Sequence, residues 1–124
     1  MALTLKEYNT ACAKLAGTTF VEQWGGAQVW KVGGKVFAIA WFEAGQQPQI
    51  TFKVSDIGWE VLRDTEGCRP APYMASRGLK WIQSHAKPGL SKAELKKYLE
   101  ASYKMVREAL PKRVRATLDI GEAT

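Results

Sequence analysis

The sequence has one histidine, two cysteines and no long hydrophobic run. General acid–base and nucleophilic catalysis need a base held beside its partner, commonly a histidine next to Ser or Cys, or two carboxylates. His85 lies in a polar segment, so we expect it to be an exposed loop residue. No group of His, Cys or carboxylate residues has metal-ligand spacing, and no helix follows the glycine pairs 25–26 and 33–34, as a phosphate-binding loop requires. The sequence therefore predicts no enzyme, no cofactor and no metal site.

The few cysteines and the short apolar runs also bear on location. Cys12 and Cys68 are far apart in the sequence, and the first 20 residues include Lys6, Glu7 and Lys14, which interrupt any signal-peptide core. The longest uncharged apolar run, residues 36–42, is far shorter than the roughly 20 residues of a membrane-spanning helix. We therefore expect a cytoplasmic protein with reduced thiols and no membrane partner.

The composition is that of a globular domain. Hydrophobic residues make up 46% and charged residues 24% of 124 residues, which predicts one domain whose core needs neither disulfides nor metal. We place this domain at residues 1–116. Residues 117–124 are predicted to be a short, flexible acidic tail that frays.

Three helices are indicated by their N-terminal caps. Thr4 and Glu7 form a capping box before an apolar stripe that ends near residue 17. Ser55 or Asp56 is suited to cap a short helix that ends near residues 65–67. A second capping box at residues 91–94 begins a long amphipathic helix that Pro111 stops.

Strand-like segments alternate with glycine-rich turns between the first two helices. The predicted strands are 19–24, 28–32, 35–42 and 49–54, and glycine pairs supply the first two turns of an antiparallel meander. The period-two pattern of 49–54 predicts one buried face, which a helical layer must cover. Residues 69–74 contain two prolines and are predicted to be an edge strand, paired with 79–83 over a turn at 75–78. The fold class is a two-layer α+β domain.

Positive charge is concentrated in the last third of the chain. The net charge is +6, and residues 77–116 hold 11 Lys and Arg against 3 Asp and Glu. Such a cluster is suited to nucleic-acid phosphates, and an exposed tryptophan beside it would stack on bases. The candidate nucleic-acid-binding residues are Arg77, Lys80, Trp81, Lys87, Lys112, Arg113 and Arg115.

A structural interpretation of the same residues stays open. Lys96, Glu100 and Lys104 interleave as on an ordinary solvated helix face. Basic residues near residue 112 also complement the dipole of a helix that ends at Pro111. Tryptophans are mostly buried, so Trp81 is also a candidate for core packing.

Five segments in order resemble a known family. They are VWKVGGKVFA at 29–38, ITFKV at 50–54, RPAPYM at 69–74, GLKWI at 78–82 and LPK at 110–112. This series is similar to the MmcQ/YjbR-like family and covers nearly the whole chain. The resemblance implies a domain of order α-β-β-β-(β)-α-β-β-α, similar in outline to secretion chaperones. It also implies DNA binding through a double-wing motif.

The chain departs from the family at one segment. Many members carry His-Met-Asn-Lys before a His-Trp pair, whereas this chain has Tyr-Met-Ala-Ser-Arg at 73–77 and Lys-Trp at 80–81. Any family role that needs those histidines is therefore not implied for this chain.

Three functions follow, in order of preference. The first is a non-enzymatic domain that binds the phosphate backbone of DNA or another nucleic acid through its basic surface. The alternative is a protein-interaction or chaperone-like module that uses an exposed sheet face or a homodimer interface. An enzyme is third, because it would need a deep pocket that gathers Tyr73, Arg77 and His85.

Overall fold

The computed structural model describes residues 3–23, 25–72, 74 and 77–123, with side chains described as far as Leu118. The described elements are, in order, α1 (Leu5–Ala13), β1 (Thr18–Gln23), β2 (Ala27–Val32), β3 (Lys35–Trp41), β4 (Gln49–Lys53), α2 (Asp56–Leu62), β5 (Cys68–Pro70), β6 (Trp81–Ser84), α3 (Lys92–Glu108) and α4 (Lys112–Ala123).

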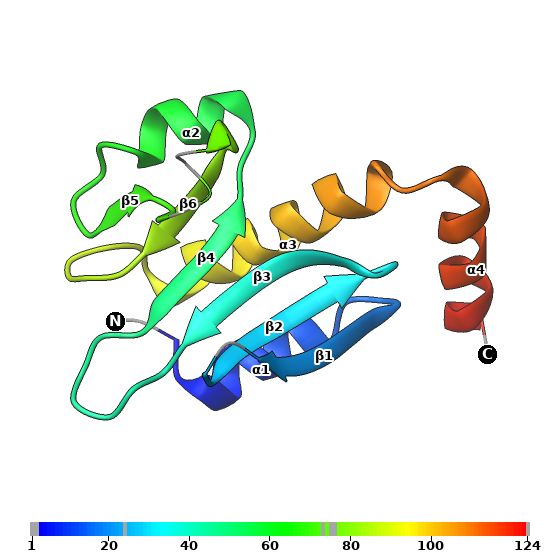
Figure 1. Cartoon of the computed structure of the whole chain (residues 1–124), viewed down its shortest axis with the longest axis horizontal. Coiled ribbons are helices and arrows are strands. Elements are labelled where there is room, and N and C mark those ends of the chain that lie inside the picture. The colour runs from blue at the N-terminus through cyan, green and yellow to red at the C-terminus, as the bar shows by residue number, and fades with distance from the viewer. Residues whose placement is uncertain (1–2, 24, 73, 75–76, 124) are drawn as a thin grey trace.

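The strands form one antiparallel six-stranded sheet of order β1-β2-β3-β4-β6-β5. The first four strands are a meander, and β6 then pairs with both β4 and β5. In Figure 1, α1 and α3 lie behind the sheet, and α4 lies beyond the far end of α3. The predicted α+β fold class, with helices on one face of an antiparallel sheet, is confirmed.

The predicted helix caps are confirmed. The capping boxes Thr4–Glu7 and Ser91–Glu94 are both formed, and the Ser55 hydroxyl accepts a hydrogen bond from the amide of Gly58. Glu7 also forms an ion pair of 3.0 Å with Lys92, the first residue of α3. The N-terminal ends of α1 and α3 are therefore joined through one carboxylate.

A β-bulge changes the direction of the side chains of β3. Trp30 pairs with Ala38 and Lys31 pairs with Val36, so Phe37 is an extra residue between them. Phe37 and Ala38 consequently both join the main core, and from there on Ile39 faces away from the helices. Residues 36–42 form one continuous apolar run because each face of the strand joins a hydrophobic cluster, the main core on one side and the cluster around Ile39 on the other.

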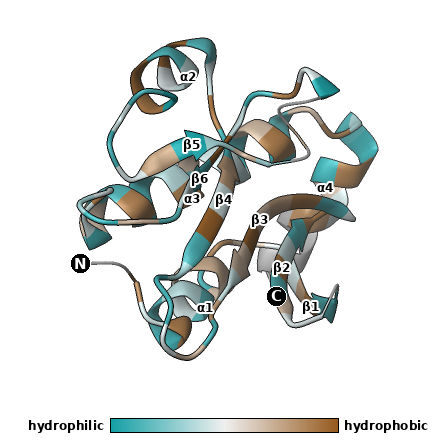
Figure 2. Cartoon of the chain, turned by 60° about the vertical axis from the view of Figure 1, so that its left-hand side comes forward, coloured by the Kyte–Doolittle hydropathy of each residue, from teal (hydrophilic) through white to brown (hydrophobic). Residues whose placement is uncertain are grey.

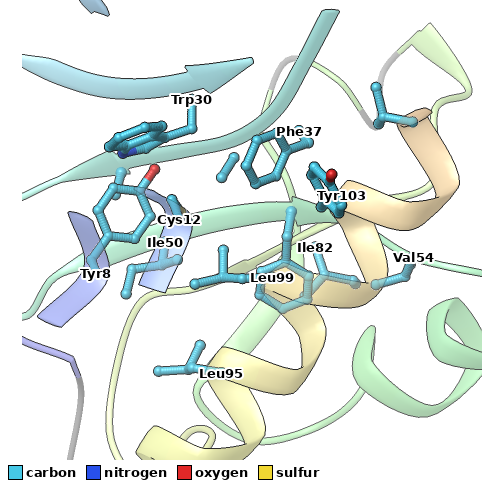
Figure 3. Close-up of a cluster of buried hydrophobic side chains, with 14 of the residues drawn as sticks. Tyr8, Cys12, Trp30, Phe37, Ile50, Val54, Ile82, Leu95, Leu99 and Tyr103 are labelled. Atoms are coloured by element: carbon cyan, nitrogen blue, oxygen red, sulfur yellow. The ribbon is translucent and has the colours of Figure 1, made fainter. Parts of the chain in front are cut away.

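The main core lies between the sheet and α1 and α3. Figure 3 shows Tyr8, Phe37, Ile50, Leu99 and Tyr103 gathered there. In β4 the predicted alternation of hydropathy is visible as bands of opposite colour in Figure 2. Phe52 of this strand is fully buried in the main core and stacks on Tyr98 of α3. A separate, small cluster lies on the other face around Val29 and Ile39.

Ser102 of α3 hydrogen-bonds to the bulged residue of β3 and to the neighbouring strand β4. Its hydroxyl accepts from the backbone N–H of Lys53 at 2.9 Å and donates to the carbonyl oxygen of Phe37 at 2.7 Å. The side chain is fully buried, so water does not replace either bond. One hydroxyl of the helix therefore bridges β3 and β4 just beyond Ala38 and Phe52, the last pair of their ladder.

Two expected boundaries are corrected by the structure. The strands predicted at 69–74 and 79–83 are confirmed as an antiparallel pair, but β5 spans Cys68–Pro70 and β6 spans Trp81–Ser84. Trp24 and Tyr73, and residues 75–76 of the expected turn, lie outside the described residues.

The C-terminal end holds a helix that was not predicted. The long helix α3 ends at Glu108, before Pro111, as expected, but the Pro111 carbonyl accepts from the amides of Val114 and Arg115 and so begins α4. Proline is tolerated at a helix start, and the backbone is helical to Ala123. Leu118 packs against the core, where a Cβ on Gly17 would lie only 2.7 Å from it. The expected domain boundary at residue 116 therefore falls inside a helix, and the flexibility of residues 117–124 stays a prediction.

We predict that Ser102→Ala lowers the free energy of unfolding by about 1–3 kcal/mol, because it leaves the buried Lys53 N–H and Phe37 carbonyl without a partner. Urea unfolding measures this. Thr117→Ala is the control, since that exposed hydroxyl bonds only within its own helix, and its effect should stay within about 0.5 kcal/mol. Equal effects of the two substitutions would contradict the bridging role.

Candidate functional site

The predicted basic residues do not converge on one surface. Lys87 lies in the connection before α3, whereas Lys112 and Arg113 follow its far end (Figure 1). The 17 residues of α3 span about 25 Å. Lys80 lies apart from both groups and forms an ion pair of 2.7 Å with Asp56 of α2. Arg77 is exposed in the connection that precedes β6.

Trp81 is not exposed as a stacking platform. Its side chain is only 8% exposed, because Trp81 lies within β6 and pairs with Lys53 of β4. The structure therefore favours the packing interpretation of this tryptophan over base stacking.

The basic residues beyond Pro111 lie at the start of a helix, whereas they were expected to follow the end of one. Lys112, Arg113 and Arg115 lie in the first turn of α4, which has no acidic residue. A helix N-terminus carries partial positive charge, so these cations oppose the helix dipole instead of complementing it. Their charge is thus unfavourable to the helix in the isolated domain.

The β2–β3 turn packs against the start of α4. Gly33 has a φ of +58°, and a Cβ at this position would lie 2.5 Å from Leu110 and 3.1 Å from Val114. Glycine is therefore required there for both conformation and space. The turn brings Lys35, which is exposed, to the same end of the molecule as Lys112 and Arg113. We call these residues the α4 basic end: Lys35, Lys112, Arg113 and Arg115.

A second candidate site, which the sequence did not indicate, lies on the open face of the sheet. It is a cleft of about 610 Å³. Its lining residues come from β3, β4, β5, β6 and the connections next to them: Ile39, Trp41, Glu43, Gln49, Thr51, Arg69, Pro72, Met74 and Gln83. The volume is within the range of about 300–1,000 Å³ that is typical of small-molecule sites.

Strand register places the polar residues of this cleft in one row. Ile39 pairs with Thr51, Thr51 with Gln83, and Gln83 with Arg69. Arg69 donates from Nε and Nη2 to Gln83 Oε1 at 2.9 and 2.7 Å, and Gln83 Nε2 donates to Thr51 Oγ1 at 3.1 Å. Both Gln83 and Thr51 are only 3% exposed.

The charge of Arg69 affects the single histidine. Burial and the nearby Arg69 guanidinium both lower the pKa of His85, in that order of size. His85 is half-buried in the connection after β6. Both effects favour the neutral form of the imidazole.

The remaining reactive groups are less suited to chemistry. Cys12 and Cys68 are both buried free thiols, and burial raises the pKa of each, so neither is an activated nucleophile. Within the described ranges, no three His, Cys, Asp or Glu side chains are grouped to hold a metal ion. None of the helices in the described part of the chain is long and apolar enough to cross a membrane.

Sequence reasoning missed the cleft because its residues are distant in sequence and its row depends on register. Thr51 and Gln83 are polar residues in strand segments, and each is buried. A partial signal was available, since a polar residue inside an apolar strand often has a hydrogen-bonding partner. That signal identifies no partner without the strand order.

Comparisons with known proteins agree on the fold. The family model described as YjbR matches residues 13–105. A Deinococcus radiodurans protein with a DUF419 domain is similar in structure, with a TM-score of 0.79 and 18% identity, over 94% of this chain and 88% of the other. A Pseudomonas syringae protein has a TM-score of 0.65 and 18% identity, over 84% of this chain and 99% of the other. The search of curated proteins found no match.

We predict that Arg69→Met raises the pKa of His85 toward its ordinary value of 6.5, because the substitution removes a nearby positive charge. Since this chain has one histidine, proton NMR follows its titration without ambiguity. Arg63→Met, at the exposed C-cap of α2, should leave the pKa unchanged.

The lowered pKa of His85 also makes the stability of the fold depend on pH. Because folding lowers this pKa, the stability that the neutral imidazole contributes is lost as pH falls below about 6.5 and through the folded-state pKa. The loss should be smaller in the Arg69→Met protein. An unchanged His85 titration in that variant would contradict the coupling.

Proposed function

We propose that the chain, which belongs to the YjbR family, is a non-enzymatic domain that binds the phosphate backbone of nucleic acid through its α4 basic end. The observation that carries this proposal is the group of Lys112, Arg113 and Arg115 in the first turn of α4, with no acidic residue in that turn. A phosphate placed there relieves repulsion with the helix dipole and releases counterions from the nucleic acid.

The neighbouring residues support the same surface. Lys35 adds charge from the β2–β3 turn, which packs on the start of α4. Arg115 is half-buried and its Nε is shielded from solvent, so Lys35, Lys112 and Arg113 provide the exposed charge of this surface. The β2–β3 hairpin and α4 thus both place cations at the same end of the molecule, where they can contact a phosphate backbone together.

The proposed contact surface includes fewer residues than the sequence indicated. Lys80 is paired with Asp56, Lys87 lies at the other end of α3, and Trp81 is buried. We therefore leave these three outside the contact surface. The buried free thiols of Cys12 and Cys68 are compatible with a reducing compartment, and we propose a cytoplasmic location.

A double substitution tests the surface. Lys112→Gln with Arg113→Gln should weaken binding to a fluorescein-labelled DNA duplex about tenfold at low salt, measured by anisotropy. The slope of log K against log salt should flatten by about 0.9 for each phosphate that the variant no longer neutralises. Both side chains are exposed, so the fold should be retained.

Lys96→Gln with Lys97→Gln is the matched control. It removes the same charge from exposed positions near the other end of α3 and should leave most of the binding. Equal reductions in affinity in the two double variants would contradict a localised surface. Absence of binding by the unmodified protein at about 50 mM salt would overturn the proposal.

One observation favours the second candidate, a protein-interaction module. Ile57 and Val61 lie one turn apart on α2, and they are 78% and 57% exposed. If the domain binds no DNA but light scattering shows a dimer that Ile57→Lys dissociates, the interaction function replaces the nucleic-acid function.

A further inference from the structure

We propose that the cleft on the open sheet face binds a small organic monocarboxylate with an aromatic or branched apolar body. This site is separate from the α4 basic end and does not depend on nucleic-acid binding. It rests on the direction of the hydrogen bonds in the polar row, on the charge of Arg69 and on the apolar wall of the cleft.

In the polar row formed by Arg69, Gln83 and Thr51, the hydrogen bonds can run in only one direction, from Arg69 toward Thr51. A guanidinium has only donors, so Gln83 must present its oxygen to Arg69. The Gln83 amide nitrogen must then face Thr51, and the Thr51 oxygen accepts its bond. The Thr51 hydroxyl proton is left to donate, and Thr51 lines the cleft. The row therefore presents donors to a ligand.

Arg69 adds further donors and a positive charge. Its bonds to Gln83 use Nε and one N–H of Nη2, which leaves Nη1. Among the described residues Arg69 has no carboxylate within ion-pair distance, and its field lowers the pKa of His85. A planar carboxylate matches this arrangement, because guanidinium groups bind it through parallel N–H···O bonds.

The other side of the cleft is apolar. Ile39 and Trp41 of β3 and Met74 of the β5–β6 connection line it, and Met74 packs against the small cluster that contains Ile39. Trp41 is only partly buried and offers an aromatic surface. The ligand body that fits this wall is a ring or a branched chain.

Glu43 restricts the ligand to one negative charge. It lines the same cleft and is exposed, with no ion pair among the described residues. A second carboxylate or a phosphate on the ligand would be repelled by Glu43. The cleft therefore favours monocarboxylates over dicarboxylates and organic phosphates.

The test uses the full chain labelled with ¹⁵N and three probes, namely indole-3-acetate, phenylacetate and 4-methylpentanoate. Their uncharged primary amides are the matched ligands. We expect saturable shifts of the Trp41 indole and Gln83 side-chain signals, with an affinity at least about tenfold weaker for each amide. Arg69→Met should weaken carboxylate binding about tenfold or more, whereas Arg63→Met at the C-cap of α2 should leave it unchanged.

A second variant keeps the test informative if Arg69→Met does not fold. Met74→Asp places a negative charge on the cleft wall from a connection, outside the sheet and the main core, and it should also abolish carboxylate binding. No shifts at about 10 mM of any carboxylate would overturn the proposal. So would equal affinity for acids and amides. Binding of a peptide with a free C-terminal carboxylate, but of none of the three small acids, would overturn the assignment to a small molecule.

Discussion

The extra residue at Phe37, held by Ser102, is the constraint on which the two faces of the sheet depend. A bulge shifts the side-chain phase of a strand, so Ala38 and Ala40 face the helices and Ile39 and Trp41 face the opposite side. The small alanines allow α3 to approach the sheet closely. The larger residues become the wall of the cleft. A single hydroxyl from the helix bonds to the Phe37 carbonyl and to the Lys53 N–H, and so ties the bulged residue of β3 to β4 and α3.

The two proposed sites lie on different parts of the molecule, and the proposed binding of anions has a different basis in each. The α4 basic end is exposed, so the proposed attraction to phosphates depends on charge and is sensitive to salt. The cleft combines one guanidinium with a nearly buried polar row, so the proposed binding there depends on hydrogen-bond geometry as well as on charge. Because a fold does not determine a function, membership of the YjbR family supports the architecture alone, and each site is argued from its own residues.

Much of the fold could be predicted from local patterns. The capping boxes at Thr4 and Ser91 mark the starts of α1 and α3 by chemistry within one turn. The first four strands follow from β-branched segments and glycine pairs. The helix after Pro111 was missed for a local reason too, since proline is compatible with both the end of one helix and the start of the next. Because of this omission, Lys112 and Arg113 were assigned to a helix C-terminus, whereas they lie at a helix N-terminus.

The sequence by itself determined the composition of the layers, the antiparallel meander and the excess of positive charge in the last third of the chain. Only the tertiary structure decided which basic residues share an end, which tryptophan is buried, and that a cleft exists at all. The physical reason is that caps, turns and hydrophobic periods act between neighbours in sequence. The row from Arg69 through Gln83 to Thr51 instead depends on β6 inserting between β4 and β5, and no local pattern in those strands specifies that order.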